Sequence, residues 1–284
     1  QARVTGVGFI TLAWNLPVDT GVGDASRGLL DFFVTRTKGN SNLSCSCFCQ
    51  SCLNCGLCDA GECCNLTIAA AFGENYSIVF SGMPTGPSQY YFAIFARNDA
   101  GYGASSTIAN EQSVNTPGPP TNLSATNAAP RVVNLFWSGP ADTGVGISTV
   151  CNPYCRNITG YRVVCIASVD GLSASCNRTE ILPSTLPSGT TQIEIQGLNH
   201  KADFYTFQIF ALNDAGTSNA SIISPVFSIE NPTEPILVHA QISNKPFAVD
   251  IAWAPPSDTG RGGTKEAILD YVLEMALHGN FSNI

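Results

Sequence analysis

Three aspartates of this chain begin the same triplet, Asp-Thr-Gly, at Asp19, Asp142 and Asp258. The triplet could supply acid–base chemistry, because the two aspartates of an aspartic protease share one proton. Each copy, however, follows a Trp and a Pro, and none has the apolar flanks that would bury such a pair. Proline fixes φ, aspartate caps a turn and glycine accepts positive φ, so the triplet favours a turn. One carboxylate per loop also falls short of the roughly six to eight oxygen ligands that Ca²⁺ takes.

A second candidate is a run of eight cysteines within a predicted insertion over residues 40–66. Thiolates at this density could hold metal ions, but zinc sites usually pair Cys-x2-Cys knuckles at wider separation or use His ligands. In an oxidising compartment the run favours disulfides that fold a knob, with a connectivity that the spacing leaves open. Two glycosylation sequons, at Asn42 and Asn65, flank the run and indicate an exposed loop. The cysteines are Cys45, Cys47, Cys49, Cys52, Cys55, Cys58, Cys63 and Cys64.

Four further cysteines lie in the middle of the chain, and we expect the pairs Cys151–Cys155 and Cys165–Cys176. The first pair lies within one loop, and the second ties the end of a strand to the segment after it. Both are predicted to staple loops, because a redox role would need a Cys-x-x-Cys pair here.

The other residues that could carry chemistry stand apart. His200, His239 and His278 have no acidic or Ser partner at motif spacing, so we interpret them as solvent-facing or loop residues. The sequence contains no nucleophile elbow, P-loop or His-Glu-x-x-His motif. We therefore predict no enzymatic activity, no metal site and no cofactor beyond covalent glycans.

The triplets must be positioned by strands. An alternating apolar run precedes each triplet and ends in Trp14, Trp137 or Trp253. A period of two is typical of a strand with one buried face, so the three tryptophans are predicted core residues. They follow one another after 123 and 116 residues, which is the length of a small domain and too long for a solenoid unit. The chain is therefore expected to be a tandem array.

Two more strands recur at matching offsets. One contains Phe32, Tyr161 or Tyr271, at 18, 24 and 18 residues after the respective Trp. The other is strongly alternating, begins at Tyr90 and again at Tyr205, and ends each time in Asn-Asp-Ala-Gly. That tetrapeptide indicates a hairpin turn.

Together these residues resemble the fibronectin type III domain, which has its core Trp on strand B, a Pro- and Asp/Gly-rich B–C loop, and a Tyr-x-Phe strand F. The resemblance implies an all-β fold of tandem, immunoglobulin-like β-sandwiches with Cys-rich loop insertions. It also implies that Tyr90 and Tyr205 are core residues whose hydroxyls close a tyrosine corner. A true immunoglobulin domain would carry its Trp on strand C between two framework cysteines, and neither feature is present. The F–G loops lack the Arg-Gly-Asp tripeptide that some members of the family use to bind integrins.

Pro-rich segments mark the domain boundaries. They predict one domain over residues 1–116, a second over 117–232, and strands A–C of a third over 233–284. Short connectors stiffened by proline favour a rod. Half a sandwich leaves its inner face uncovered and is unstable alone. Either the chain continues beyond an excerpt, or another subunit donates the missing strands.

The composition indicates the compartment of the protein and limits its classes of partner. A net charge of −8 with only 12% charged residues makes nucleic-acid binding unexpected. No apolar run reaches the ~18–20 residues of a membrane span, and we expect any leader or anchor to lie outside this segment. Twelve cysteines together with eight sequons predict an extracellular or cell-surface glycoprotein. The sequons are at Asn42, Asn65, Asn75, Asn122, Asn157, Asn177, Asn219 and Asn280.

Two functions remain open from the sequence. The first is structural: a rod-like unit of a surface filament, fibril or matrix, assembled end to end by strand complementation. Its partners would be copies of itself or neighbouring domains of a longer array. The alternative is the ectodomain of an adhesion or recognition protein, with the Cys-rich insertion as its binding element. Accessory domains of a secreted enzyme are a third class, in which residues 1–284 would be inert.

Overall fold

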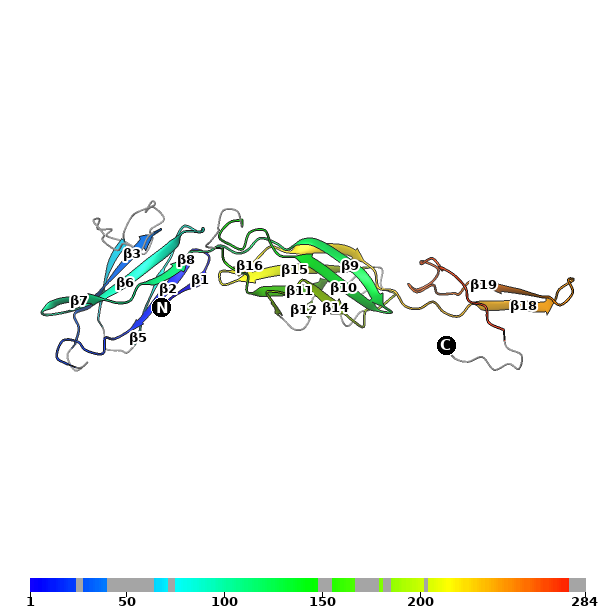
Figure 1. Ribbon diagram of the computed structural model, residues 1–284, viewed down its shortest axis with the longest axis horizontal. Coiled ribbons are helices and arrows are strands. Elements are labelled where there is room, and N and C mark those ends of the chain that lie inside the picture. The colour runs from blue at the N-terminus through cyan, green and yellow to red at the C-terminus, as the bar shows by residue number, and fades with distance from the viewer. Residues whose placement is uncertain are drawn as a thin grey trace.

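The structure is a computed structural model that describes residues 1–23, 28–39, 64–70, 75–147, 155–166, 179–180, 185–201 and 204–275. Within these ranges every regular element is a β-strand, and no helix is long and apolar enough to cross a membrane. The strands form three groups that follow one another along a single long axis (Figure 1). The described part of the chain is therefore a rod.

The first group is a sandwich of two antiparallel sheets. One sheet has the order β1-β2-β5, and the other has the order β4-β3-β6-β7 with β8 also paired to β6. The strands are β1 (Ala2–Gly6), β2 (Phe9–Asn15), β3 (Asp31–Lys38), β4 (Cys64–Ala69), β5 (Asn75–Phe80), β6 (Gln89–Asn98), β7 (Gly101–Ser105) and β8 (Ala109–Gln112).

The second group repeats this topology. A sheet with the order β14-β10-β9 faces a sheet with the order β12-β11-β15-β16. In the second sheet, β13 also pairs with β11, and β17 also pairs with β15. The strands are β9 (Thr121–Ala129), β10 (Val132–Ser138), β11 (Gly160–Ile166), β12 (Thr179–Glu180), β13 (Leu186–Pro187), β14 (Gln192–Ile195), β15 (Tyr205–Asn213), β16 (Gly216–Thr217) and β17 (Ser221–Val226). In fibronectin type III lettering, strands A, B and E are β1, β2 and β5 in the first sandwich and β9, β10 and β14 in the second. Strands C′, C, F and G are β4, β3, β6 and β7 in the first and β12, β11, β15 and β16 in the second.

Each sandwich has its own core, built from the inward side chains of alternating strands. In the second sandwich, Trp137 is buried at 4% exposure, with its ring centroid 5.5 Å from that of Tyr161. In the first, Trp14 is partly buried and packs edge-on against Phe32 at 5.6 Å. The alternation around these tryptophans correctly predicted which face of β2 and β10 is buried.

The strand-F tyrosines close corners as the resemblance implied. The Tyr205 hydroxyl donates to the carbonyl of Asn199 at 3.1 Å and accepts from the Asn199 N–H at 2.7 Å. The Tyr90 hydroxyl donates to the carbonyl of Pro84 at 3.1 Å. Burial raises the pKa of Tyr90, an effect that the nearby Arg36 charge reduces.

Replacement of Tyr205 by Phe is expected to destabilise its sandwich more than the same change at Tyr90. Tyr205→Phe removes two hydrogen bonds and leaves the Asn199 N–H without this partner, which costs about 1–3 kcal/mol, against about 1 kcal/mol for Tyr90→Phe. Hydrogen exchange of strand-F amides in mild urea measures each sandwich separately. Equal losses in the two variants would contradict the role of the second bond.

The third group contains two strands, β18 (Ile236–Ile242) and β19 (Val249–Ala254), paired over Ile236↔Ala254 to Ile242↔Val249. Trp253 packs near Tyr271 with ring centroids 5.6 Å apart, but it stays 40% exposed. The expected strand C around Tyr271 forms no ladder in the described residues. Strand C pairs with C′ and F in the other two domains, and those strands have no counterpart in the described part of the third. Trp253 is therefore less buried than Trp137, as expected for a half sandwich whose inner face is uncovered.

Candidate functional site

The Asp-Thr-Gly triplets all form the same turn, which confirms the prediction made for them. Oδ1 of Asp142 accepts the N–H of Gly144 at 2.7 Å and the N–H of Gly146 at 2.9 Å. Asp19 and Asp258 accept from the equivalent amides at 2.7 to 3.0 Å. Each carboxylate holds its own loop together, in a different domain from the other two.

The second triplet also binds the linker that enters its domain. The N–H of Asn115 donates to the carbonyl of Gly144 at 2.8 Å, and the N–H of Gly118 donates to the carbonyl of Asp142 at 2.8 Å. Backbone atoms make both bonds, so the residue types at the donor and acceptor positions do not by themselves identify them.

The third triplet repeats this arrangement. The N–H of Glu230 donates to the carbonyl of Gly260 at 2.9 Å, and that of Thr233 donates to the carbonyl of Asp258 at 2.9 Å. At both junctions the two donors are three residues apart and the acceptors are the Asp and Gly of the triplet. The loop is therefore a docking element for the preceding linker, a role that sequence reasoning missed.

The glycine of the triplet is required by this close approach. Gly144 has φ +109° and Gly260 has φ +115°, a region that side-chain-bearing residues rarely adopt. A Cβ at Gly144 would collide with the carbonyl oxygen of Asn115, and one at Gly260 with that of Glu230. Only glycine lets the linker backbone lie directly on the loop.

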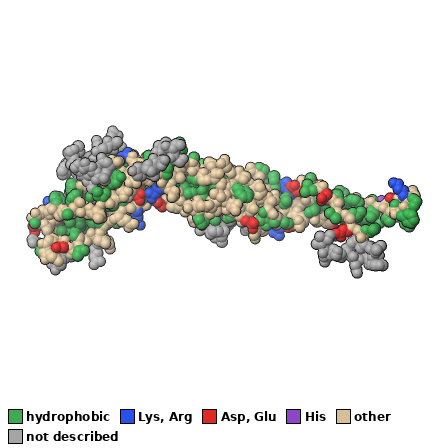
Figure 2. All heavy atoms as spheres, viewed as in Figure 1, with side chains coloured by type: hydrophobic (Ala, Val, Ile, Leu, Met, Phe, Trp, Pro, Cys, Tyr) green, Lys and Arg blue, Asp and Glu red, His purple; other side chains and the backbone are tan. Residues whose placement is uncertain are grey.

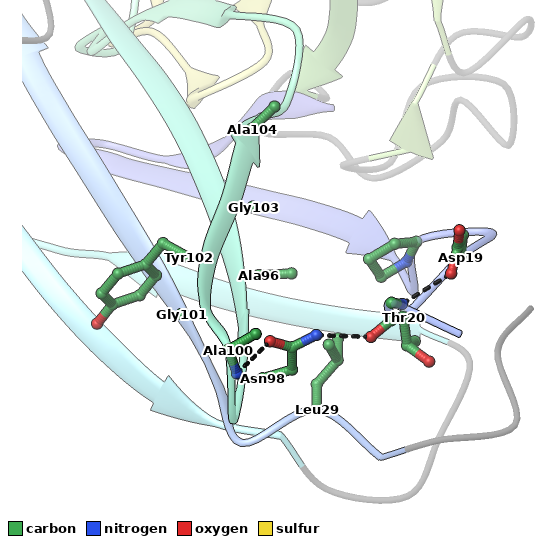
Figure 3. A pocket seen from close by; sticks show the side chains of 12 residues that line it. Asp19, Thr20, Leu29, Ala96, Asn98, Ala100, Gly101, Tyr102, Gly103 and Ala104 are labelled. Carbon is green, nitrogen blue, oxygen red and sulfur yellow. Dashed lines mark hydrogen bonds between the residues drawn. The ribbon is translucent and has the colours of Figure 1, made fainter. Parts of the chain in front are cut away.

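The Asn of the F–G turn fastens the linker from the other side. Nδ2 of Asn213 donates to the carbonyl of Asn115 at 2.8 Å and to that of Thr143 at 2.9 Å. Its Oδ1 accepts the N–H of Ala215 at 2.9 Å. In the first domain Nδ2 of Asn98 makes the equivalent bond to the carbonyl of Thr20 at 3.0 Å (Figure 3). The hairpin turn predicted from Asn-Asp-Ala-Gly is confirmed, and its Asn has this further role.

A small apolar cluster seals the first junction. Val4 of β1, Val114 of the linker and Val145 of the second B–C loop are buried together, at 8%, 0% and 2% exposure, with Ala215 packed beside them. Three pieces of chain meet there, so the cluster forms only when both domains are in place.

An ion-pair cluster lies at the same junction. Arg156 binds Glu111 of the first domain, with Nη1 and Oε1 2.6 Å apart, and Asp214 of the second through Nη2. Burial opposes the charge on Arg156, but its hydrogen bonds to Asp214 and Glu111 outweigh that effect and raise its pKa. Charged side chains are sparse along the visible face of the rod, and both signs gather near the first junction (Figure 2).

Arg156→Met is expected to loosen the first junction while leaving both sandwiches folded. The variant keeps the apolar stem but leaves the half-buried Glu111 unpaired, which costs about 1–2 kcal/mol. Exchange of the Asn115 and Gly118 amides should become faster. Arg97→Met is the matched control, because Arg97 pairs with Asp31 inside the first domain. Unchanged exchange in Arg156→Met, or an equal effect in the control, would contradict the prediction.

The second junction has the same two backbone hydrogen bonds as the first but different side-chain contacts. The guanidinium of Arg261 lies 3.7 Å from the ring centroid of Phe227 and also bonds Glu266 at 3.0 Å. Nε2 of His200 lies 3.8 Å from Oδ2 of Asp258. The pKa of Asp258 is lowered, first by the N–H of Gly260 and further by the charges of His200 and Lys201, against the opposing effect of burial.

The predicted glycosylation sites are accessible wherever their side chains are described. Asn75, Asn122, Asn157 and Asn219 are all exposed, so their occupancy remains a prediction that the structure permits. Asn42, Asn177 and Asn280 lie outside the described residues, and only the backbone of Asn65 is described.

Most of the predicted disulfide framework also lies outside the described residues. This applies to the insertion cysteines from Cys45 to Cys63, to Cys151 and to Cys176. Cys155 and Cys165 are both disulfide-bonded, and their pairing stays a prediction. Among the described residues, no group of three or more His, Cys, Asp or Glu side chains is placed to hold a metal ion.

No family model matches the chain. The solved structures that resemble it include tandem fibronectin type III segments. The chain is 26% identical over 189 residues to the netrin receptor DCC of Rattus norvegicus, covering 62% of this chain and 11% of the receptor. Among solved structures, the FN1–FN3 domains of chicken CNTN1 match at a TM-score of 0.46 and 15% identity, covering 78% of this chain and 61% of that one. A two-domain fibronectin type III segment of chicken tenascin matches at 0.30 and 13% identity, over 79% of this chain and 96% of the segment. The chain thus spans about a tenth of the length of the curated relative.

Proposed function

We propose that this chain of tandem fibronectin type III domains is part of the ectodomain of an adhesion or recognition protein, in which the domains form a stiff, non-catalytic spacer. The observation that carries the proposal is the junction that occurs twice, with the same two backbone bonds and the same glycine contact. Because the same junction occurs twice, each linker is held against the domain that follows it in the same way. The resemblance to a receptor segment supports this function over a catalytic one.

Stiffness is the physical basis of the spacer. Neighbouring domains move relative to one another by default unless their interface is large and apolar. Here each linker is bonded to the next B–C loop, and the first junction adds Asn213, the valine cluster and Arg156. A linker bonded on both sides loses the freedom that would let it act as a hinge.

We further propose that the Cys-rich insertion over residues 40–66 is the binding element. It follows β3, and its last three residues, 64–66, already belong to β4, which pairs with β3 from Asp31↔Ala69 to Arg36↔Cys64. Both ends of the insertion are therefore fixed by this ladder. Loops on rigid scaffolds often carry recognition. The disulfide bonds at Cys155 and Cys165 support an oxidising, extracellular setting.

The test is a variant in which residues 40–63 are replaced by a two-residue Asn-Gly turn, with Cys64→Ser to avoid an odd thiol. The probe is binding of the dye-labelled, secreted chain to the surface of the cells that secrete it. We expect binding to be lost while the unfolding temperature and the solution length of the rod stay unchanged. A variant with Asn42→Gln and Asn65→Gln keeps the cysteines and controls for the flanking sugars. Undiminished binding without the insertion would overturn this assignment.

A filament remains a second candidate, and the third domain favours it. Leu237, Trp253, Val272 and Leu273 are 65%, 40%, 82% and 64% exposed and line a hollow of about 200 Å³ on the face of β18 and β19. Large exposed apolar patches mark interaction sites. Strand donation by another subunit would cover this face. Sedimentation that shows concentration-dependent growth, abolished by Leu237→Lys, supports the filament, whereas a monomer at every concentration opposes it.

A further inference from the structure

The first domain carries the same B–C loop as the other two domains. Asp19 caps it through Gly21 and Gly23, and Asn98 ties it to the F–G turn. The bond from Asn98 to the Thr20 carbonyl is 3.0 Å, against 2.9 Å for its counterpart in the second domain. The docking element is therefore already built at the outer end of the first domain.

A groove lies where a linker docks in the other domains. It encloses about 390 Å³ between the B–C loop and the β6–β7 hairpin, with Asn98 in its middle and the small residues Ala100, Gly101, Gly103 and Ala104 along one wall (Figure 3). Gly21 has φ +109°, the same value as Gly144. A Cβ at Gly144 would meet a linker carbonyl, whereas a Cβ at Gly21 would meet only Asn98.

The valine that follows the triplet shows the same contrast. Val145 is 2% exposed because the preceding domain and its linker cover it. Val22 stands at the equivalent position of the first copy and is 51% exposed. The valine after the triplet is thus buried at the first junction but exposed to solvent in the first domain.

We propose that this groove binds the outgoing linker of a fibronectin type III domain that precedes Gln1 in the same polypeptide. The two linkers in the chain define the chemistry of the occupant, because Ser113–Gly118 and Ser228–Thr233 share the pattern Ser, Val or Ile, two residues, Pro and one residue. The N–H groups of the third and sixth positions donate to the loop. At the first junction the aliphatic residue, Val114, also packs beside Val145, the counterpart of Val22. Proline at the fifth position has no N–H and lies between the two donors.

A second copy of the chain is a poorer source for this segment. Its own linkers already donate the same N–H groups to their own loops at 2.8 to 2.9 Å. A linker from another copy would have to give up those bonds first. A linker one 123-residue step before Ser113–Gly118 would lie just ahead of Gln1, in the register that this groove requires.

The test adds to the full chain an N-terminal extension that repeats residues 113–123, which restores the spacing between linker and strand found in the second domain. In a ¹⁵N-labelled sample, we expect the extension amides that copy Asn115 and Gly118 to exchange at least 10-fold more slowly than in an unstructured peptide. Two changes should remove this protection: Pro at both copied positions, which deletes the donors, and Val22→Asp, which charges the exposed apolar wall.

The native amides of Asn115 and Gly118 in the same molecule serve as the internal reference. The proposal is overturned if the extension exchanges as fast as its Pro version while these reference amides stay protected. It is also overturned, in favour of a second copy, if the unextended chain dimerises and Val22→Asp abolishes the dimer. Neither outcome depends on the Cys-rich insertion, so the proposed function is tested separately.

Discussion

Gly144→Ala is expected to break the first junction without unfolding either sandwich. The backbone at φ +109° costs a residue with a side chain about 1–3 kcal/mol, and the new Cβ would also collide with the Asn115 carbonyl and with Nδ2 of Asn213. A combined loss of about 3 kcal/mol would speed exchange of the Asn115 and Gly118 amides roughly 100-fold. The rod should also bend, which small-angle scattering measures as a shorter maximum dimension.

Gly23→Ala separates backbone strain from the collision. Gly23 has φ +92° in the first B–C loop, and a Cβ there would meet nothing within 4 Å. We expect this control to cost only the strain and to leave the junction amides unchanged. If Gly144→Ala leaves these amides as protected as Gly23→Ala does, the linker bonds do not hold the junction.

Trp137→Ala is expected to destabilise the second sandwich strongly. Its side chain is 4% exposed and packs against Tyr161, so the substitution leaves a large cavity and costs about 3–5 kcal/mol. Trp253→Ala, in the same motif, should cost far less because that side chain is 40% exposed. Exchange of the β15 amides reports the loss in the second domain, independently of the first.

The comparison of the two tryptophans tests whether the motif or its surroundings determine the energy. If both variants lose equal stability, the uncovered face described for the third domain does not exist in solution. If Trp137→Ala costs under about 1 kcal/mol, the core around Tyr161 is not what holds the second sandwich together.

Much of the fold could be predicted from the sequence because its signals are local. Alternation around Trp14 and Trp137 indicates strands with one buried face, and the resemblance to the fibronectin type III pattern places Tyr90 and Tyr205 on strand F. The Asp-Thr-Gly turn was also predictable, since aspartate caps the amides that directly follow it. Each of these inferences needed only residues within a few positions of one another.

The junctions were not predictable for the opposite reason. The bonds from Asn115 and Glu230 join backbone atoms, which every residue carries, so no residue type marks them. Arg156 meets Glu111 and Asp214 across 45 and 58 positions of sequence. One signal was available: the glycine of the triplet is present in all three copies, as a close approach of another backbone would require.

The expected strand C of the third copy shows a different limit. Tyr271 has the spacing of a strand residue, but a strand exists only when a neighbour completes its ladder. In the described residues, the neighbours that pair with this strand in the other two domains have no counterpart. Local pattern therefore predicted the residue's place in the repeat and not its pairing.

The docked linkers also determine how the rod responds to a pulling force. Tension along the rod passes from one sandwich to the next through each linker, and two backbone bonds hold each linker to its loop. The sandwiches resist with longer ladders, such as β3 and β6, which pair from Asp31↔Arg97 to Lys38↔Tyr90. The linkers should therefore peel from their loops first and return when the load is removed. Such a rod would extend slightly at each junction before any domain unfolds.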